Sequence, residues 1–221
     1  MTFEGFPDDG LVFYEGLEAD NSKTYWTQHK GAYDRNVKAP LVALLDELAP
    51  EFGTAKIFRP YRDVRFSNDK TPYKTHQGAV VHADGHGTGA WYVQISADGL
   101  HVSGGSWRLE SDQVARYRRA VADDVQGLRL QAEVDRLAAA GWEIRGEKLT
   151  RVPAGYSADA ERLDLLRHKS LHASRSWEPA EWLHEPRALD EVRSAWRELR
   201  TLNTWLADNV GATTKEPRAR R

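Results

Sequence analysis

The sequence of 221 residues is 40% apolar and 29% charged, and it carries a net charge of −2. A chain of this length and composition can bury a hydrophobic core without disulfides or structural metal ions. Because it has no cysteine, disulfides and thiolate metal sites are excluded. The first residues lack a basic segment followed by an apolar run, and no stretch approaches the roughly 20 apolar residues of a membrane-spanning helix. We therefore expect a cytoplasmic protein with no membrane partner.

The first 53 residues have helical periodicity. Leu11, Tyr14 and Leu17 recur every three residues, which predicts a short helix that Asp8 or Asp9 caps. A longer helical pattern follows, with Asp20, Asn21 or Ser22 as its cap and Gly53 at its end. Pro40 lies inside this pattern, and a proline lacks the N–H of a helical residue and crowds the preceding turn. We expect a kink or a restart of the helix there.

From residue 54 the pattern changes to the alternation typical of strands. We expect strands over residues 57–66 (bent at Pro60), 78–82, 91–96 and 100–103, with turns over residues 68–72 and 83–89 and at Asp98-Gly99. Strands joined by turns this short must be antiparallel. The middle of the chain is therefore predicted to form a meander.

Helical periodicity returns after the meander. We expect helices from Ser111 to residue 125, over 128–140, over 158–167 and over 189–206, and a late hairpin that pairs residues 142–144 with 148–152. This order predicts an α+β fold, with a central antiparallel β-meander (about residues 54–104) packed against N-terminal and C-terminal helices. We expect a single domain over residues 1–210 and a flexible basic tail over residues 211–221.

The most informative segment is residues 59–74, here called the basic hairpin. With Lys56 just before it, this region holds six basic residues and two aspartates, a local charge of +4 on an otherwise acidic chain. A small basic patch on an acidic body suits a discrete anionic ligand better than a long polyanion. The sequence therefore predicts a site for a phosphate- or carboxylate-bearing small molecule.

Residue types within the basic hairpin suggest particular roles. On a strand over residues 61–67, Asp63 and Arg65 share a face, so that Asp63 can orient the Arg65 guanidinium. Tyr73 and His76 return from the turn and are candidate proton-transfer groups. The catalytic candidates are Asp63, Tyr73 and His76; the ligand-binding candidates here are Arg59, Arg62, Arg65, Ser67, Lys70 and Lys74.

Two other interpretations of the basic hairpin stay open. Asp63 and Asp69 could neutralise the cations in a structural ion-pair network, which is commoner in proteins than a site. The hairpin could also be the surface of a nucleic-acid or protein-interaction module, assisted by the basic residues 215–221. A concave site with a recessed Arg65 would favour the small anion, and a convex hairpin with exposed cations would favour the module.

The run RDVRFSNDKTPYKTHQG resembles the signature of a widespread, largely bacterial family of conserved hypothetical proteins, a domain of unknown function. The resemblance extends to DNSKTYWTQHKGAY, GGSW, LTRVPAGY and LLRHKSL, which together cover most of the chain. It implies one integrated domain but no reaction. Because the shared residues include charged and hydroxyl side chains, it also favours a site at the basic hairpin.

Further ligand-binding candidates lie outside the hairpin. Trp107 follows the glycine pair of GGSW, Arg151 and Tyr156 flank a rigid turn, and Arg167 follows a short helix. We expect them to join the hairpin residues in one anion pocket.

We expect neither a metal nor a cofactor. The His82, Asp84 and His86 run falls in a glycine-rich turn, and His168 and His172 lack an acidic companion. Nucleophile-elbow, P-loop and dinucleotide motifs are also missing from the sequence. No motif in the sequence names a substrate, a reaction or an oligomeric state.

Overall fold

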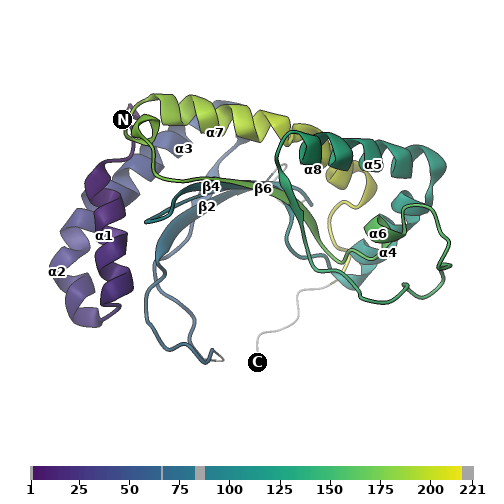
Figure 1. The fold of residues 1–221 in the computed structure, drawn as a ribbon, viewed down its shortest axis with the longest axis horizontal. Coiled ribbons are helices and arrows are strands. Elements are labelled where there is room, and N and C mark those ends of the chain that lie inside the picture. Colours follow the sequence, from purple (N-terminus) through teal and green to yellow (C-terminus); the bar gives the residue numbers. More distant parts are fainter. Residues whose placement is uncertain (1, 66, 83–87, 216–221) are drawn as a thin grey trace. The chain divides into compact units, whose positions relative to one another are not determined.

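A computed structural model of the chain describes residues 2–65, 67–82 and 88–215 (Figure 1). The chain forms two compact units, each assembled from three segments. Unit 1 consists of Met1–Val81, Tyr92–Val102 and Ser176–Ala195, and unit 2 of His82–Trp91, Ser103–Arg175 and Trp196–Arg221. Neither unit is a continuous stretch of sequence. The single domain expected over residues 1–210 stays a prediction.

Unit 1 begins with the helices α1 (Asp8–Ala19) and α2 (Lys23–Tyr33). Pro7 precedes α1, and the expected caps Asp8 and Asp9 lie instead in its first turn, where negative charge favours the helix N-terminus. The N-cap of α2 is Ser22, which is one of the three residues predicted as caps. Its hydroxyl accepts a hydrogen bond from the Tyr25 N–H (3.1 Å).

Pro40 disturbs the long helix one turn before its own position. A π-helical segment, η1 (Asp34–Lys38), separates α2 from α3 (Ala39–Phe52). Pro40 cannot donate a hydrogen bond to the Asn36 carbonyl and crowds it, and the Ala39 N–H bonds to the Asp34 carbonyl five residues back. The expected kink is therefore a π-helical turn. The helix ends at Gly53, which adopts a φ of 98°.

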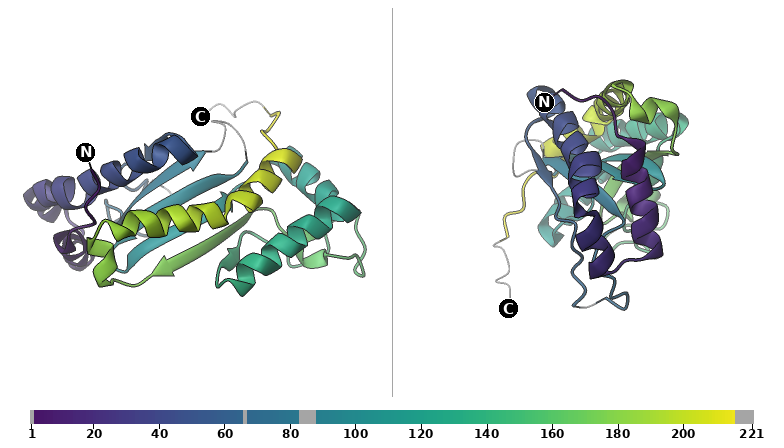
Figure 2. Two further views of the ribbon diagram at one scale, coloured as in Figure 1. Left: turned by 90° about the horizontal axis from the view of Figure 1, so that it is seen from above. Right: turned by 90° about the vertical axis from the view of Figure 1, so that its left-hand side faces the viewer.

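The strands form one antiparallel sheet, as predicted (Figures 1 and 2). Its order is β1 (Ala55–Ile57), β2 (His76–His82), β3 (Ala90–Ser96), β4 (Gly99–Ser106), β6 (Leu171–Trp177) and β5 (Glu143–Arg145). Ile57 pairs with Ala79, and Ile144 pairs with Ala173. The α+β class and the central meander are thus confirmed. The predicted turn over residues 83–89 lies mostly outside the described residues.

Two details of the sheet differ from expectation. The tight turn between β3 and β4 is at Ala97-Asp98, and Gly99 already belongs to β4. The predicted partner of β5, residues 148–152, is wrong because β5 pairs with β6, and Lys148 makes only an isolated bridge to His168. The glycine at 146 has a φ of 141°, which interrupts the extended backbone after β5.

Unit 2 contains the helices α4 (Ser111–Ala122), α5 (Asp124–Ala139), α6 (Leu163–Leu166) and α8 (Arg200–Asn209). The cap of α4 is Glu110, in a capping box with Gln113, and not Ser111. The helix expected over residues 158–167 is reduced to α6, because Arg162 before it has a left-handed φ of 56°.

The amphipathic pattern expected as one helix over residues 189–206 is divided into two. α7 (Arg187–Glu198) follows a 3₁₀ turn, η2 (Glu181–His184), and a single residue, Leu199, separates it from α8. The backbone of Leu199, with ψ near −5°, departs from the α-helix at the junction. The apolar side chains keep their register across this break, and Leu199, Leu202 and Leu206 are all buried.

The glycine pair of GGSW has a structural explanation in unit 2. Gly105 lies inside β4 with a φ of 131°, and a Cβ atom there would lie 2.5 Å from the carbonyl oxygen of Leu171 in β6. A Cβ on Gly104 would lie 2.8 Å from the Leu199 side chain. Both glycines therefore allow β4 to contact its neighbours closely.

Residues 211–215, which we expected to belong to the flexible tail, are hydrogen-bonded to α4. Gln113 donates to the Gly211 carbonyl (2.8 Å), and Arg116 donates to the Ala212 carbonyl (2.6 Å). Asp112 accepts hydrogen bonds from the Thr213 hydroxyl and the Thr214 N–H. The remainder of the expected tail, residues 216–221, lies outside the described residues.

None of the helices in the described parts of the chain combines the length and the apolarity needed to cross a membrane.

Candidate functional site

The basic hairpin continues the β1–β2 pair toward its tip, within unit 1. Tyr61 and Tyr73 form an isolated antiparallel bridge. The Arg62 N–H donates to the Pro72 carbonyl (2.9 Å), and the Lys74 N–H donates to the Pro60 carbonyl (2.8 Å). The two arms of the predicted hairpin are therefore paired as far as Arg62 and Pro72.

Beyond that point the expected strand over residues 61–67 is replaced by turns. The Asp63 carboxylate accepts a hydrogen bond from the backbone N–H of Arg65 (3.3 Å), and the Asp69 carboxylate accepts one from the N–H of Thr71 (2.9 Å). Aspartate side chains that bind nearby N–H groups compete with the ladder of a sheet, which explains the difference. Lys70 closes the tip by donating to the Val64 carbonyl (2.9 Å). Phe66 lies outside the described residues.

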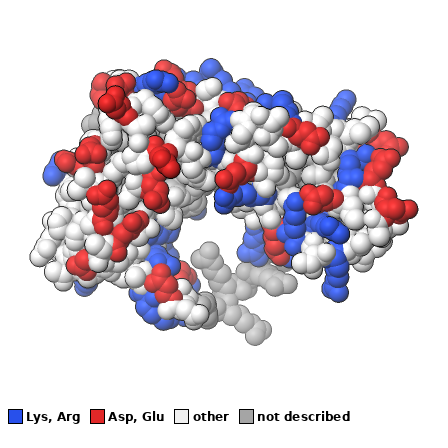
Figure 3. All heavy atoms as spheres, viewed as in Figure 1, with Lys and Arg blue, Asp and Glu red and all other residues white. Residues whose placement is uncertain are grey.

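Ion pairs fix two of the predicted ligand-binding arginines. Arg62 pairs with Asp69 and donates to the Thr71 hydroxyl (2.6 Å). Hydrogen bonds from Thr71, followed by the one from Arg62, lower the pKa of Asp69 to about 2. Figure 3 shows basic and acidic side chains interleaved at the tip of this hairpin, the loop that descends from β2 in Figure 1. This part of the predicted ion-pair network is present.

Arg65 is oriented by Asp63, as expected, but it is not recessed. Its Nε and one terminal nitrogen donate to the two oxygens of Asp63 (2.9 and 2.7 Å). These hydrogen bonds, together with the one from the Arg65 N–H, lower the pKa of Asp63 to about 2. The Arg65 side chain is 76% exposed. The recessed Arg65 that would have favoured a concave site at this residue is therefore absent.

A cavity of about 420 Å³ lies at the base of the hairpin, lined by Arg62, Asp63, Lys74, Thr75 and His76. Four of these five residues are sequence-predicted site residues, and Thr75 is an addition. A threonine between two polar residues gives no distinctive sequence signal, because threonine is ordinarily an exposed surface residue.

Lys74 and His76 differ from the other residues that line this cavity because the pKa of each is lowered. The Lys74 ammonium lies 5.3 Å from the centre of the Phe58 ring, and burial, then the charge of Arg59, lowers its pKa. Burial, then the charges of Lys74 and Arg62, lowers the pKa of His76 below its ordinary 6.5. His76 is therefore neutral at pH 7, in a cavity where positive charge accumulates.

Tyr73 is buried, with only 4% of its surface exposed. Its ring stacks on the indole of Trp26, with centroids 4.4 Å apart and planes 9° apart. The Asn21 side chain accepts a hydrogen bond from the backbone N–H of Tyr73 (3.0 Å) and donates one to the backbone carbonyl of Tyr73 (3.1 Å). The helix α2 and the Asn21 turn thus hold the second arm of the hairpin, and Tyr73 does not line the cavity.

The remaining hairpin candidates occupy other positions. Arg59 is exposed, and its charge lowers the pKa of both Lys74 and Asp63, so it lies near the cavity. Lys70 is exposed, and its side chain closes the tip, where the half-buried Ser67 also lies. Neither Ser67 nor Lys70 lines the cavity.

The predicted site residues outside the hairpin belong to unit 2. Trp107 is 40% exposed, and its ring lies 5.4 Å from that of His172. Arg151 is exposed, and Tyr156 and Arg167 are half-buried. The Arg167 Nε is enclosed and has no hydrogen-bond partner in the described part of the chain. Because the hairpin belongs to unit 1, convergence of these residues with it stays a prediction.

No group of three or more His, Asp or Glu side chains among the described residues is arranged to hold a metal ion. Asp84 and His86, two members of the His82, Asp84 and His86 run, lie outside the described residues. His168 is fully buried, and its Nδ1 lies 2.7 Å from the Ser170 carbonyl oxygen. A carbonyl can only accept, so Nδ1 carries the proton of the neutral ring.

Comparison with known proteins gives a family but no activity. Neither a curated protein nor a solved structure matches the chain. A family model described as a conserved hypothetical protein, DUF2461, matches residues 9–205. This match covers most of the chain and both sets of predicted site residues, and it confirms the resemblance inferred from the sequence. The chain belongs to the DUF2461 family of conserved hypothetical proteins.

Proposed function

We propose that the protein binds a small anionic molecule, bearing phosphate or carboxylate, in the cavity at the base of the basic hairpin. The observation that carries this proposal is the cavity lined by Arg62, Lys74 and His76, in which burial and neighbouring cations lower the pKa of both Lys74 and His76. A half-enclosed cavity with accumulated positive charge is stabilised when an anion enters it. Arg62 and Lys74 would bind the anion, and the Thr75 hydroxyl could donate to it.

The same geometry favours His76 over Asp63 as the proton-transfer group. Asp63 has a pKa of about 2, so at neutral pH it is a weak proton acceptor. His76 is neutral at pH 7 and keeps one donor and one acceptor nitrogen for the ligand. Asp63 would instead hold Arg65 at the rim, where the exposed guanidinium attracts the anion. His76 is therefore the residue that would transfer a proton if the bound anion reacts. Because we expect the protein to be cytoplasmic, the anion would be a metabolite of the cytoplasm.

The substitution Lys74→Met tests the site, with Lys56→Met as its matched control. Lys56 is an exposed lysine of β1 outside the cavity, so both variants lose one positive charge. Thermal shift with inorganic phosphate, pyrophosphate, citrate and acetate identifies a stabilising anion, and calorimetric titration then gives its Kd. We expect the Kd to rise at least tenfold in Lys74→Met, because one charge-assisted contact contributes roughly 1.5–3 kcal/mol.

Lys56→Met should bind within about twofold of the parent protein, since charges that are exposed and distant are screened by salt. Equal affinity in Lys74→Met and Lys56→Met would remove the cavity as the anion site. A parent protein that none of the four anions stabilises would contradict the proposal itself.

A further inference from the structure

A second cavity in unit 1 lies at the turn between β3 and β4. Its volume is about 230 Å³, and residues of β3, β4 and β6 line it. The polar side chains of this lining are those of Gln94, Ser96, Asp98, His101 and Ser176. The sequence analysis connected none of these five residues with function. We call this space the sheet cavity, and the space lined by Lys74 and His76 the hairpin cavity.

Tyr92 connects the two cavities across one face of the sheet, because its strand β3 lies between β2 and β4. On the β2 side, the Tyr92 hydroxyl lies 2.3 Å from the place of a Cβ atom on Gly78. Gly78 is two residues from His76 on the same strand, so both face the same side. On the β4 side, the Tyr92 ring lies 6.0 Å from the His101 ring. His76 and His101 therefore share a face of the sheet.

The two cavities are close enough for one small molecule to reach both. Neighbouring strands are about 4.8 Å apart, so β2 and β4 are separated by roughly 10 Å. In agreement, the charge of His101 contributes to lowering the pKa of His76. Between the cavities lie two aromatic rings, since the Phe58 ring faces the Lys74 ammonium and lies 6.3 Å from the Tyr92 ring. A phosphorylated hexose is long enough to extend from one cavity to the other.

The sheet cavity offers hydrogen bonds, whereas the hairpin cavity offers positive charge. The His101 Nδ1 lies 2.9 Å from the Ser176 hydroxyl oxygen, and the Tyr92 hydroxyl donates to the Gln94 side-chain oxygen (2.7 Å). These contacts orient Ser176 and Gln94, and a hydroxyl and an amide nitrogen can each form further hydrogen bonds. The exposed Asp98 adds a carboxylate. Such a mixture of donors and acceptors suits ligand hydroxyl groups, which both donate and accept.

From these observations we infer that the sheet cavity binds the hydroxyl groups of the molecule whose anionic group occupies the hairpin cavity. The ligand is then a sugar or another polyol that carries a phosphate or a carboxylate. Its carbon skeleton would lie over the rings of Phe58 and Tyr92. This inference rests on the proposed function and adds to it the class of the ligand and a second set of binding residues.

The experiment compares two double variants with the same changes of residue type. Gln94→Leu with Ser176→Ala alters the sheet cavity, whereas Gln28→Leu with Ser194→Ala alters exposed residues of α2 and α7 outside both cavities. Calorimetric titration measures the Kd of two matched pairs of probes, which are glucose 6-phosphate with inorganic phosphate and glucuronate with acetate. The melting temperature of each variant shows whether it is folded. Ser176→Ala alone, at an exposed position, replaces a double variant that does not fold.

We expect one sugar anion to bind the parent protein at least about tenfold more tightly than the simple anion of its pair, because added hydrogen bonds accompany the same charge. In the sheet-cavity variant the Kd of this sugar anion should rise at least about fivefold, while that of the simple anion should stay within about twofold. The control variant should bind both probes within about twofold of the parent. Lys74→Met should weaken both probes, because it alters the shared anionic subsite.

Three results would overturn the inference while leaving the proposed function in place. Both sugar anions could bind no more tightly than the simple anions that Lys74→Met weakens. The two double variants could bind the sugar anion equally well. Glucosamine 6-phosphate could bind at least about tenfold more tightly than glucose 6-phosphate, which would make the ligand group beside Asp98 a cation. A parent protein that binds none of the four probes would instead contradict the proposed function, and the inference with it.

Discussion

At the scale of single residues, the basic hairpin separates cations that stabilise the fold from cations that line a cavity. Arg62 and Arg65 are each held by an aspartate, and both aspartates have a pKa of about 2. Lys74 and His76 have pKa shifts in the opposite sense, toward their neutral forms, because burial and nearby cations disfavour their charge. The second pair is therefore where an anion would have the largest effect.

Buried histidines make the stability of the fold depend on pH. Burial lowers the pKa of His168 below its ordinary 6.5, and the charge of Lys148 acts in the same direction, while Asp164 and the Ser170 hydrogen bond oppose it. The unfolded chain therefore binds the proton more readily than the folded chain. The stability that neutral His168 contributes is present above about pH 6.5 and is lost as the pH falls below that value.

We predict that His168→Asn flattens this pH dependence, because the asparagine amide can still donate to the Ser170 carbonyl but does not titrate. The measurement is the free energy of unfolding in urea at pH 7.5 and pH 5.5. His76 has a pKa shift of the same direction, so His76→Asn should also flatten the dependence, and the double variant should do so most. A His168→Asn protein as sensitive to pH as its parent would show that His168 is not the titrating group.

At the scale of elements, the hairpin depends on a turn that is distant in sequence. Asn21 lies between α1 and α2, and its side chain satisfies both the N–H and the carbonyl of Tyr73. The aromatic side chains of Trp26, Tyr61 and Tyr73 then pack around this connection. The cavity at the base of the hairpin is therefore positioned from the N-terminal helices as well as from the sheet.

The substitution Asn21→Ala should destabilise the protein by roughly 1–3 kcal/mol, because two partly buried backbone groups of Tyr73 lose their partners. Hydrogen exchange should accelerate at the amides of Arg62 and Lys74, which close the hairpin, and not at that of Trp142 in unit 2. Asn21→Asp keeps the acceptor for the Tyr73 N–H and should lose less stability. Unchanged exchange at Arg62 and Lys74 in Asn21→Ala would contradict this anchoring role.

At the scale of the whole molecule, each compact unit is assembled from three separate segments. Residues 211–214 belong to unit 2 and are hydrogen-bonded to its helix α4, through Asp112, Gln113 and Arg116. The hydrogen bonds to Asp112 lower the pKa of its carboxyl group. The last segment of the sequence is thus part of the folded unit at least as far as residue 214.

A chain that ends after Val210 should melt at least about 3 °C below the parent, because the buried Gln113 amide loses its acceptor and one such hydrogen bond contributes about 1 kcal/mol. A chain that ends after Lys215 keeps these contacts and is the matched control. Differential scanning calorimetry of the two truncated proteins is the measurement. Identical melting temperatures would show that residues 211–215 contribute nothing to stability.

Local patterns in the sequence were sufficient for the class of fold and for the location of the hairpin. The three-residue spacing of Leu11, Tyr14 and Leu17, the alternation of the middle segment and its short turns each depend on neighbouring residues. The expected meander and the Ser22 cap are present for this reason. The concentration of charge in residues 59–74 is likewise a property of the sequence, and it led to three of the five residues that line the cavity, with His76 predicted just beyond it.

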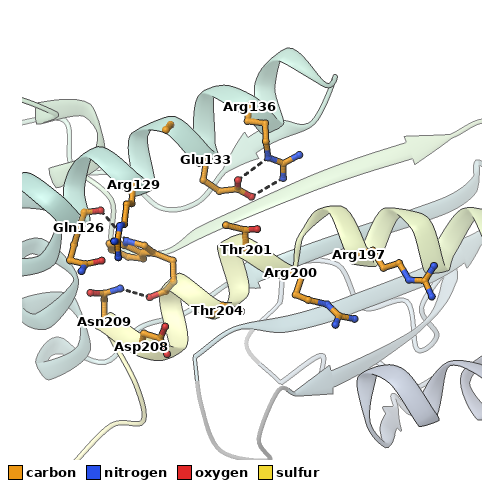
Figure 4. Close-up of a pocket in the computed structure, with 12 residues that line it drawn as sticks. Gln126, Arg129, Glu133, Arg136, Arg197, Arg200, Thr201, Thr204, Asp208 and Asn209 are labelled. Carbon is orange, nitrogen blue, oxygen red and sulfur yellow. Dashed lines mark hydrogen bonds and ion pairs between the residues drawn. The ribbon is translucent and has the colours of Figure 1, made fainter.

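Tertiary structure decided what depends on contacts between distant segments. β6 was missed because its partners β4 and β5 lie far away in sequence, and it is rich in small and polar residues that give no strand signal by themselves. The strand expected over residues 61–67 is not formed beyond Arg62, because the carboxylates of Asp63 and Asp69 bind backbone N–H groups and so compete with strand pairing. The cavity of about 950 Å³ between α5 and α8 (Figure 4) is lined by residues that are about seventy positions apart, and it exists only because these helices pack together. Local periodicity fixes elements, whereas the packing of distant elements determines which of their charged side chains share a cavity.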